Sequence, residues 1–130
     1  MGPRPNVRLL GIDHVQVAAP PGCEPEARRF YGELLGLSEL SKPPVLQARG
    51  GVWFACGERH QLHVGVSEHF AAADKAHPAL QVDSADLERL ARRLEASHAP
   101  VHWDDAIPGT RRFYTEDPWG NRLELVGVAG

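Results

Sequence analysis

The stretch DPWGNRLELV, residues 117–126, combines a tight turn with a strand in which apolar and polar side chains alternate. Pro118 and Gly120 are typical turn residues. In the strand that follows, Leu123 and Leu125 share one face and Glu124 lies on the other. Because a carboxylate is costly to bury unless it is paired, its ordinary place is a face that water reaches. The polar face that carries Glu124 is therefore the first candidate for a functional surface.

The size and charge of the chain limit what it can be. With 130 residues and 42% apolar content, we expect one domain over residues 1–130, built as a single unit or as two halves that share a core. The net charge of −3, without a basic stripe, indicates neither a nucleic acid nor a membrane as partner. No apolar run approaches the roughly 20 residues of a membrane span, and no secretory signal is recognisable. We predict a cytoplasmic protein with a small-molecule partner, whose two cysteines, Cys23 and Cys56, are reduced.

Outward from the opening strand, the chain divides into two halves with the same order of elements. In the first half, a helix is predicted within residues 24–37, and strands within 8–19 and near 37–40, 45–49, 52–56 and 60–66. In the second half, a helix is predicted within 84–98, and strands within 76–84, 99–103, 110–117 and 121–128. We therefore predict an α+β fold of two βαβββ modules, about 7–68 and about 75–128, that form a cupped mixed sheet with helices on its outer face.

A fixed offset of 63 residues supports this repeat. It relates residues at corresponding places in the two halves: His14 to His77, Gly57 to Gly120, Arg59 to Arg122, Gln61 to Glu124 and Leu62 to Leu125.

Period-two alternation places polar groups on one face of four strands. His14, His77, Glu124 and the pair Gln61 and His63 all lie opposite the apolar residues of their strands. Two imidazoles and a carboxylate that leave coordination positions open suit a catalytic divalent metal. Since Gln61 and His63 share a face, we expect only one of them to approach the ion. The remaining histidines are interpreted as surface residues: His60, His69, His98 and His102.

Four segments resemble the vicinal oxygen chelate superfamily, which includes glyoxalase I, methylmalonyl-CoA epimerase, fosfomycin and bleomycin resistance proteins, and extradiol dioxygenases. They are GIDHVQVAA (11–19), ARRFYGELLGL (27–37), KAHPALQV (75–82) and FYTEDPWGNRLEL (113–125). The resemblance implies paired βαβββ modules, a homodimer, and a divalent ion inside the cup, which could be Zn, Ni, Mn, Co or Fe.

The ligand pattern of the family falls on His14, His77 and Glu124. The internal repeat favours Gln61 as fourth ligand, which resembles the His, Gln, His, Glu set of the epimerase branch, and His63 is the alternative. The pattern departs from bacterial glyoxalase I, which has a Glu at the fourth position. It also lacks the second acid/base carboxylate of the epimerase branch, because PPVLQARGGVWFAC (43–56) contains none.

The leading functional hypothesis is a metal-dependent, glyoxalase-like enzyme of the lyase or isomerase type, acting on a small oxygen-rich molecule. Glu124 is its expected catalytic residue, as ligand and proton carrier. The expected substrate-binding residues are Trp53, Gln61, Arg111 or Arg112, Phe113 and Tyr114. The alternatives are a small-molecule-binding or resistance protein without turnover, an extradiol-type dioxygenase with Tyr114 or His63 as acid/base, and an interaction module that kept only the fold.

Overall fold

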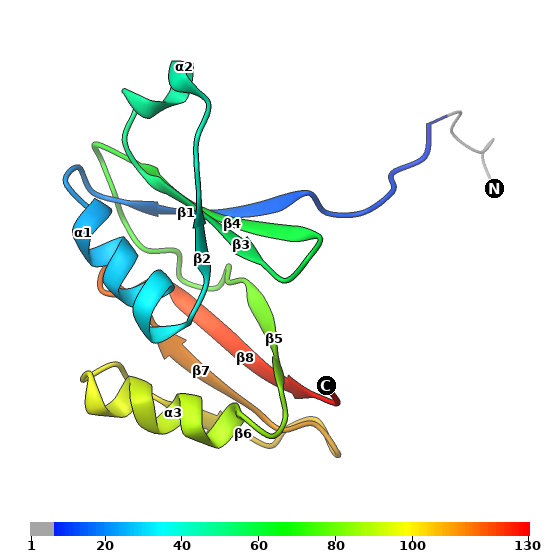
Figure 1. The fold of residues 1–130 in the computed structure, drawn as a ribbon. Helices are drawn as coiled ribbons and strands as arrows, with labels where there is room; N and C mark the ends of the chain where they lie inside the picture. Colours follow the sequence, from blue (N-terminus) through cyan, green and yellow to red (C-terminus); the bar gives the residue numbers. More distant parts are fainter. Residues whose placement is uncertain (1–6) are drawn as a thin grey trace.

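The structure, a computed structural model, describes residues 7–130 and contains two four-stranded mixed sheets (Figure 1). The first sheet has the order β1-β4-β3-β2 and is built from β1 (His14–Ala19), β2 (Ser38–Leu40), β3 (Val52–Cys56) and β4 (His60–Val66). The second has the order β5-β8-β7-β6 and is built from β5 (Ala79–Asp83), β6 (His102–Asp104), β7 (Arg112–Glu116) and β8 (Arg122–Val128). The helices are α1 (Glu24–Ala27), which continues as the π-helix η1 (Arg28–Leu34), α2 (Pro44–Gln47) and α3 (Leu87–Ala96).

Both sheets follow the same connection rule, which confirms the predicted α+β fold of two βαβββ modules. In each module the first strand runs parallel to the last, as β1 to β4 and β5 to β8, and the remaining pairs are antiparallel. Two parallel strands can be joined only by a long crossover connection. In each module this connection begins with the helix that follows the first strand.

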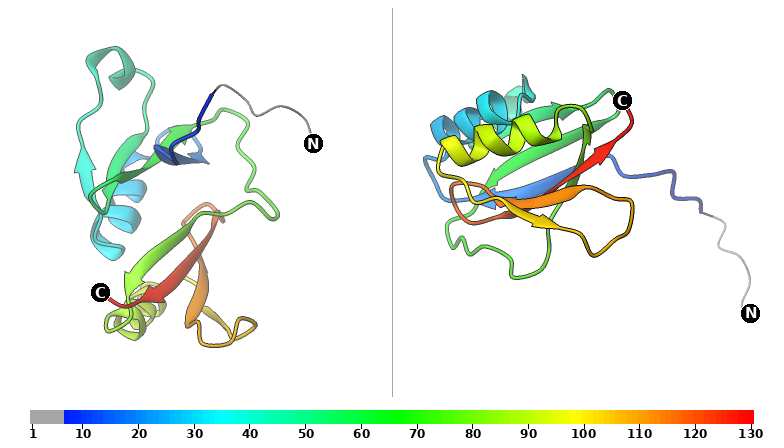
Figure 2. Two further views of the ribbon diagram at one scale, coloured as in Figure 1. Left: turned by 90° about the vertical axis from the view of Figure 1, so that its right-hand side faces the viewer. Right: turned by 90° about the horizontal axis from the view of Figure 1, so that it is seen from below.

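The apolar faces of both sheets contribute to one hydrophobic core. The helices of the two modules lie side by side (Figure 2), and η1 and α3 are in contact. In α3, Leu87, Leu90 and Leu94 recur at helical spacing and are buried, as are Phe54 of the first sheet and Phe113 of the second. Because both apolar faces are covered in this way, the polar faces of the two sheets are left on the outside.

A buried hydrogen-bond network joins the two modules through the DPWGN turn, residues 117–121. Tyr31 of η1 donates its hydroxyl proton to Asp117 Oδ2 over 2.7 Å. Asp117 Oδ1 accepts the backbone N–H groups of Trp119 and Asn121. The side chain of Asn121 in turn donates to the carbonyl of Ala18 in β1. The DPWGN turn therefore both begins β8 and connects it to the first module.

The structure corrects two details of the prediction. Residues 45–49 are not a strand, because Pro43 and Pro44 lack N–H donors and begin the short helix α2 instead. The first strand begins only at His14, since residues 7–13 carry no regular structure. The eight strands form two four-stranded sheets, one for each predicted module. Among residues 7–130, no helix is both long enough and apolar enough to cross a bilayer.

Candidate functional site

The polar face of the first sheet carries a stack of three aromatic rings. The rings of His14 and His63 lie 4.2 Å apart between centroids and are nearly parallel. On its other side, His63 stacks on Trp53 at 4.1 Å with an interplanar angle of 5°. This order follows from the register, because β4 lies between β1 and β3 and His63 is directly opposite Trp53. His63 is only 5% exposed.

The two imidazoles of this stack are positioned by neighbouring polar groups. His14 Nδ1 lies 2.9 Å from Asp13 Oδ1, which leaves Nε2 of His14 available to a ligand. His63 Nε2 lies 2.8 Å from Gln61 Oε1. Burial lowers the pKa of His63, and the proximity of His14 lowers it further. A neutral imidazole is the form that binds a metal ion.

The polar face of the second sheet carries a different pair. His77 Nε2 lies 3.1 Å from Glu124 Oε1, and the His77 ring meets Tyr114 edge-on. The other oxygen of Glu124, Oε2, accepts a hydrogen bond from Arg112 over 3.0 Å, and Arg112 also binds Asp104. Glu124 is 8% exposed, so this carboxylate is both buried and paired.

The contact between His77 and Glu124 is favourable when either a proton or a metal ion lies between the two atoms. Nδ1 of His77 lies 2.8 Å from the carbonyl of Lys75, which can only accept, so Nδ1 carries a proton. In a neutral imidazole, Nε2 then presents a lone pair to a carboxylate oxygen that has only lone pairs itself. Either a proton on Nε2 or a metal ion shared by the two atoms removes this repulsion. A divalent ion bound here would be held by His77 Nε2 and Glu124 Oε1.

The pKa of Glu124 reflects two opposing effects. Burial alone would raise the pKa of this carboxyl, but the hydrogen bonds from Arg112 and His77 together outweigh burial and lower it. Glu124 is therefore ionised at neutral pH, as a metal ligand must be.

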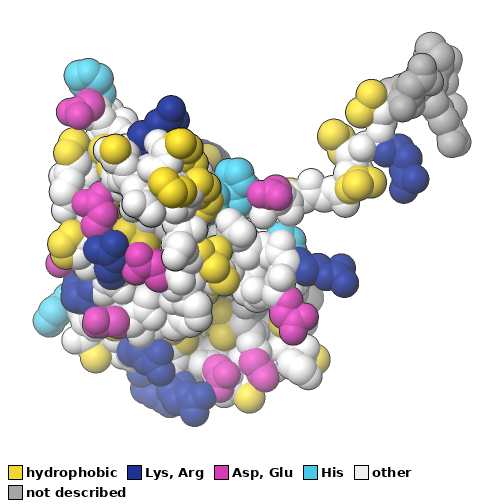
Figure 3. Space-filling view, turned by 45° about the horizontal axis from the view of Figure 1, so that its top comes forward, with side chains coloured by type: hydrophobic (Ala, Val, Ile, Leu, Met, Phe, Trp, Pro, Cys, Tyr) yellow, Lys and Arg dark blue, Asp and Glu magenta, His cyan; other side chains and the backbone are white. Residues whose placement is uncertain are grey.

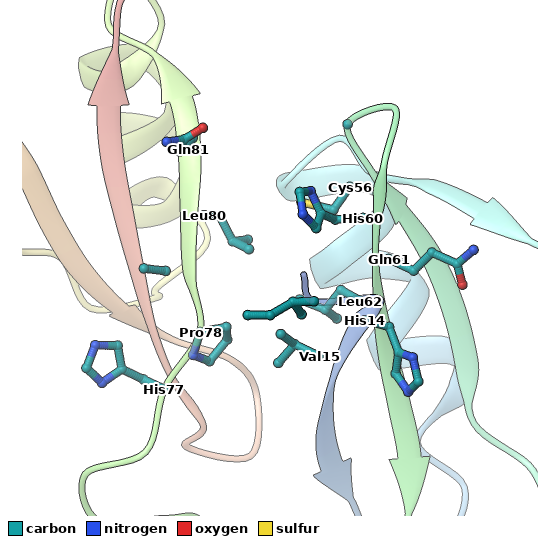
Figure 4. Close-up of a pocket in the computed structure, with 13 residues that line it drawn as sticks. His14, Val15, Cys56, His60, Gln61, Leu62, His77, Pro78, Leu80 and Gln81 are labelled. Carbon is teal, nitrogen blue, oxygen red and sulfur yellow. The ribbon is translucent and has the colours of Figure 1, made fainter. Parts of the chain in front are cut away.

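Within one chain, the structure does not bring His14, His77 and Glu124 together. His14 pairs with His63, and His77 pairs with Glu124, but the two pairs do not meet within one chain. Figure 4 shows His14 and His77 pointing away from the groove between the sheets, and away from each other. Among residues 7–130, no three His, Cys, Asp or Glu side chains come together as a metal site. The physical reason is the shared core, which leaves the polar faces of the two modules to diverge.

The strand registers also decide which residue corresponds to Glu124 in the first module. His63 is opposite Trp53 and beside Gln16, whereas Glu124 is opposite Tyr114 and beside Ala79. His63 and Glu124 are thus equivalent, at an offset of 61 and not 63. Both are buried, whereas Gln61 is half-buried. The offset of 63 holds for the first strands and fails for the last strands, because the chain between them is two residues longer in the first module.

The expected substrate-binding residues separate into three groups. Trp53, Gln61 and Tyr114 lie on the polar faces with the histidines and Glu124. Phe113 does not, because it is fully buried in the core. Nor does Arg111, which pairs with Glu88 of α3 over 3.0 Å and lies over Trp103 on the helix side. Arg112 is on the polar face, but its guanidinium is bound to Glu124 and Asp104.

Sequence reasoning missed several residues near the first-module histidines. A pocket of about 510 Å³ on this polar face is lined by His14, His63 and Trp53, and also by Gln16, Lys42, Leu46 and Arg49. Alternation could have found Gln16, which shares a face with His14. The others lie in residues 41–51, the segment that contains α2 and is called the α2 segment below, and no local pattern reveals its position over the sheet.

Comparison of the chain with known proteins identifies its family. A family model described as the Glyoxalase/Bleomycin resistance protein/Dioxygenase superfamily matches residues 11–125. The chain belongs to this superfamily. The recognised resemblance to vicinal oxygen chelate proteins is thereby confirmed. No match was found among curated proteins.

Solved structures of this superfamily share the fold along nearly the whole chain. A protein from Bacillus anthracis, assigned to the glyoxalase family, is 47% identical; the match covers 94% of this chain and 98% of that chain, with a TM-score of 0.86. Lactoylglutathione lyase from Agrobacterium tumefaciens is 25% identical, with 90% and 92% covered and a TM-score of 0.69. A mutant of the fosfomycin resistance protein FosX from Listeria monocytogenes, complexed with Mn(II) and 1S,2S-dihydroxypropylphosphonic acid, is 14% identical, with 93% of each chain covered and a TM-score of 0.75.

Proposed function

We propose that this superfamily member is a metal-dependent, glyoxalase-like enzyme of the lyase or isomerase type that acts on a small oxygen-rich molecule. The observation that carries the proposal is the contact of His77 Nε2 with Glu124 Oε1 over 3.1 Å, which places an imidazole nitrogen and a carboxylate oxygen where both can bind one ion. A divalent ion is the partner that satisfies both atoms and still leaves coordination positions for a substrate.

The working form in this proposal is a homodimer. Each chain carries two half-sites on diverging faces, His14 with His63 and His77 with Glu124. In a dimer, the first module of one copy faces the second module of the other, and each such pair completes one site.

Three features of the chain support this assembly. The strands β1 and β5 are sheet edges, so each has an unpaired backbone edge. Between them lies a groove of about 610 Å³ with apolar side chains, among them Val15, Leu62 and Leu80. The N-terminal segment leaves apolar side chains uncovered, with Leu9 94% exposed and Leu10 87% exposed (Figure 3). Apolar surface of this kind is typical of an interface.

The roles of the chain's own residues follow from their environments. His14, His63, His77 and Glu124 would hold the ion, which when bound supplies Lewis-acid stabilisation of oxygen charge in the substrate. Glu124 would be a ligand through Oε1, while Arg112 holds Oε2 in place. The rings of Trp53 and Tyr114 would exclude water from the cup.

The solved structures add support of a general kind. FosX, which shares this fold, was crystallised with Mn(II) and a phosphonic acid with two neighbouring hydroxyl groups. Lactoylglutathione lyase is named for a reaction of the lyase class.

Elemental analysis of untagged protein, purified without chelator, tests the metal. We expect about one divalent ion per chain in the wild type and a clear loss in each of H14A, H77A and E124A, because each substitution removes one donor. H69A, which changes an exposed histidine outside the site, is the matched control and should retain the ion. A wild type without metal, or undiminished metal in all three variants, would contradict the proposal.

A metal-free binding protein is the second candidate, because one observation favours it. Glu124 already has two partners in this chain, Arg112 and His77, and the latter could carry a proton instead of a metal ion. In that case the wild type would contain no metal and would still bind a small molecule in the cup.

A further inference from the structure

The segment between β2 and β3, residues 41–51, is held above the polar face of the first sheet. Its short helix α2 stands clear of the sheet in Figure 1. Three hydrogen bonds hold the segment: Lys42 Nζ donates to the carbonyl of Gly50, Gln47 Nε2 donates to the carbonyl of Lys42, and the N–H of Gly51 donates to Glu24 Oε2 over 2.7 Å. These hydrogen bonds hold the two ends of the segment together and attach its C-terminal end to α1.

This segment brings two cations to the pocket that contains His63. Lys42 and Arg49 both line the 510 Å³ pocket, together with Leu46 from the same segment and with Trp53 and His63 from the sheet. One wall of the pocket is therefore basic, and its floor is the stack of aromatic rings.

The positive charge of this wall is not neutralised by the protein. Within residues 7–130, neither Lys42 nor Arg49 forms an ion pair with a carboxylate. The carboxylate that lines the pocket, Asp13, is 92% exposed and is bound to His14. Glu24 lies near the base of the segment, but its oxygen accepts the N–H of Gly51.

We propose that Lys42 and Arg49 form an anion subsite that selects, for the site of the proposed function, substrates with a carboxylate or phosphoryl group. Ammonium and guanidinium groups both bind such oxyanions through charge-assisted hydrogen bonds. The substrate would place its neighbouring oxygens at the His14 and His63 end, its short carbon chain against Trp53 and Leu46, and its anionic group at the basic wall. This assignment deepens the proposed function and rests on it.

A matched pair of chelating probes tests the subsite on metal-loaded protein. Acetohydroxamate carries a chelating head with two neighbouring oxygens, and succinic monohydroxamate adds a carboxylate tail to the same head. We expect the wild type to bind the carboxylate probe about tenfold or more tightly than acetohydroxamate, measured by isothermal titration calorimetry. Added salt should reduce this preference, because the subsite is open to solvent.

Substitutions then assign the preference to the two cations. In R49M and K42M the preference should fall, and in the double variant it should approach one, while acetohydroxamate affinity stays unchanged. R89M removes the same charge from the exposed face of α3 and should leave the preference intact. Because Lys42 also holds Gly50, circular dichroism checks its fold, and R49M, which has no such contact, provides the independent variant.

The possible outcomes separate this inference from the proposed function. If the protein binds acetohydroxamate but shows no preference for the carboxylate probe, the anion subsite is wrong and the metal site stands. If a preference exists but persists in the double variant, the two cations are not its source and the inference is also wrong. If neither probe binds, both the subsite and the proposed metal site are contradicted.

Discussion

At His63, the structure differs from the sequence repeat: the repeat favours Gln61 as the fourth ligand, whereas the strand registers favour His63. It is enclosed by His14 and Trp53, its pKa is lowered by burial, and it occupies the position in its module that Glu124 occupies in the other. If the proposed function is correct, His63 and not Gln61 is the fourth ligand.

Two single substitutions distinguish these candidates. We expect H63A to weaken metal binding by about tenfold or more, because it removes a ligand, and Q61A to change it by no more than a few-fold, because it removes only a group that orients His63. Competition with a fluorescent chelator measures both affinities. Equal losses in the two variants, or a larger loss in Q61A, would reverse the assignment.

Tyr31 joins the two modules through its buried hydrogen bond to Asp117. We expect Y31F to lower the free energy of unfolding by about 1–3 kcal/mol, because it removes a buried hydrogen bond to an ionised acceptor. Urea denaturation measures the loss. Y114F, which removes a hydroxyl from a half-buried tyrosine outside this network, is the control and should change stability by less.

The same tyrosine makes stability depend on alkaline pH. Burial raises the pKa of Tyr31 well above its ordinary value, and the negative charge of Asp117 raises it further. Below about pH 10 the hydroxyl is protonated in both states, so its contribution is complete. Above this pH the unfolded chain releases the proton and the folded chain does not, so unfolding becomes easier by up to about 1.4 kcal/mol per pH unit. The stability difference between wild type and Y31F should therefore shrink from pH 8 to about pH 11, and a difference independent of pH would contradict this assignment.

At the residue scale, the sequence predicted which face of each strand is polar, but not every partner on it. Alternation correctly placed His14 and Glu124 opposite the apolar residues of their strands, whereas His77 lies two residues before β5 and reaches Glu124 from there. It could not distinguish Gln61 from His63, because both share a face and the repeat offset depends on the length of the chain between strands. Nor could it reveal that Arg112 is bound to Glu124, since that contact joins two neighbouring strands.

At the scale of elements, the α2 segment depends on Gly51 at its junction with β3. Gly51 has φ of +86°, and a Cβ built on it would lie 2.2 Å from the carbonyl oxygen of Val64. We expect G51A to destabilise the fold by about 3 kcal/mol or more, because it combines backbone strain with a clash against a strand. G109A provides the matched control: Gly109 also has positive φ, but nothing lies within 4 Å of its Cβ, so about 1–2 kcal/mol is expected. Urea denaturation of both variants measures the difference, and equal losses would show that the contact with Val64 is unimportant.

The elements were predictable where their pattern was local. Both long helices and most strands agree with the predicted positions, because each has a clear apolar stripe or alternation. The segment at 45–49 was read as a strand from its apolar residues, yet the two prolines before it favour a helical start.

At the scale of the whole molecule, the two halves share one core and direct their polar faces apart. Periodicity indicates which face of a strand is buried, but it carries no information on how two modules are oriented. The sequence therefore predicted the two modules but not whether they pair within one chain or between two copies. The shared core and the Tyr31–Asp117 contact give the arrangement of the single chain, and two half-sites are its consequence.

Mixing two defective variants tests the central claim, that sites are completed between copies. One variant is H14A/H63A, which lacks the donors of the first module, and the other is H77A/E124A, which lacks those of the second. Alone, neither should bind metal. After the two are unfolded and refolded together, random pairing makes about half of the dimers mixed, and each mixed dimer has one intact site of two, so about a quarter of the wild-type metal and activity should return. Sites completed within one chain would give no recovery at all, and that result, with mixed dimers shown to be present, would contradict the account.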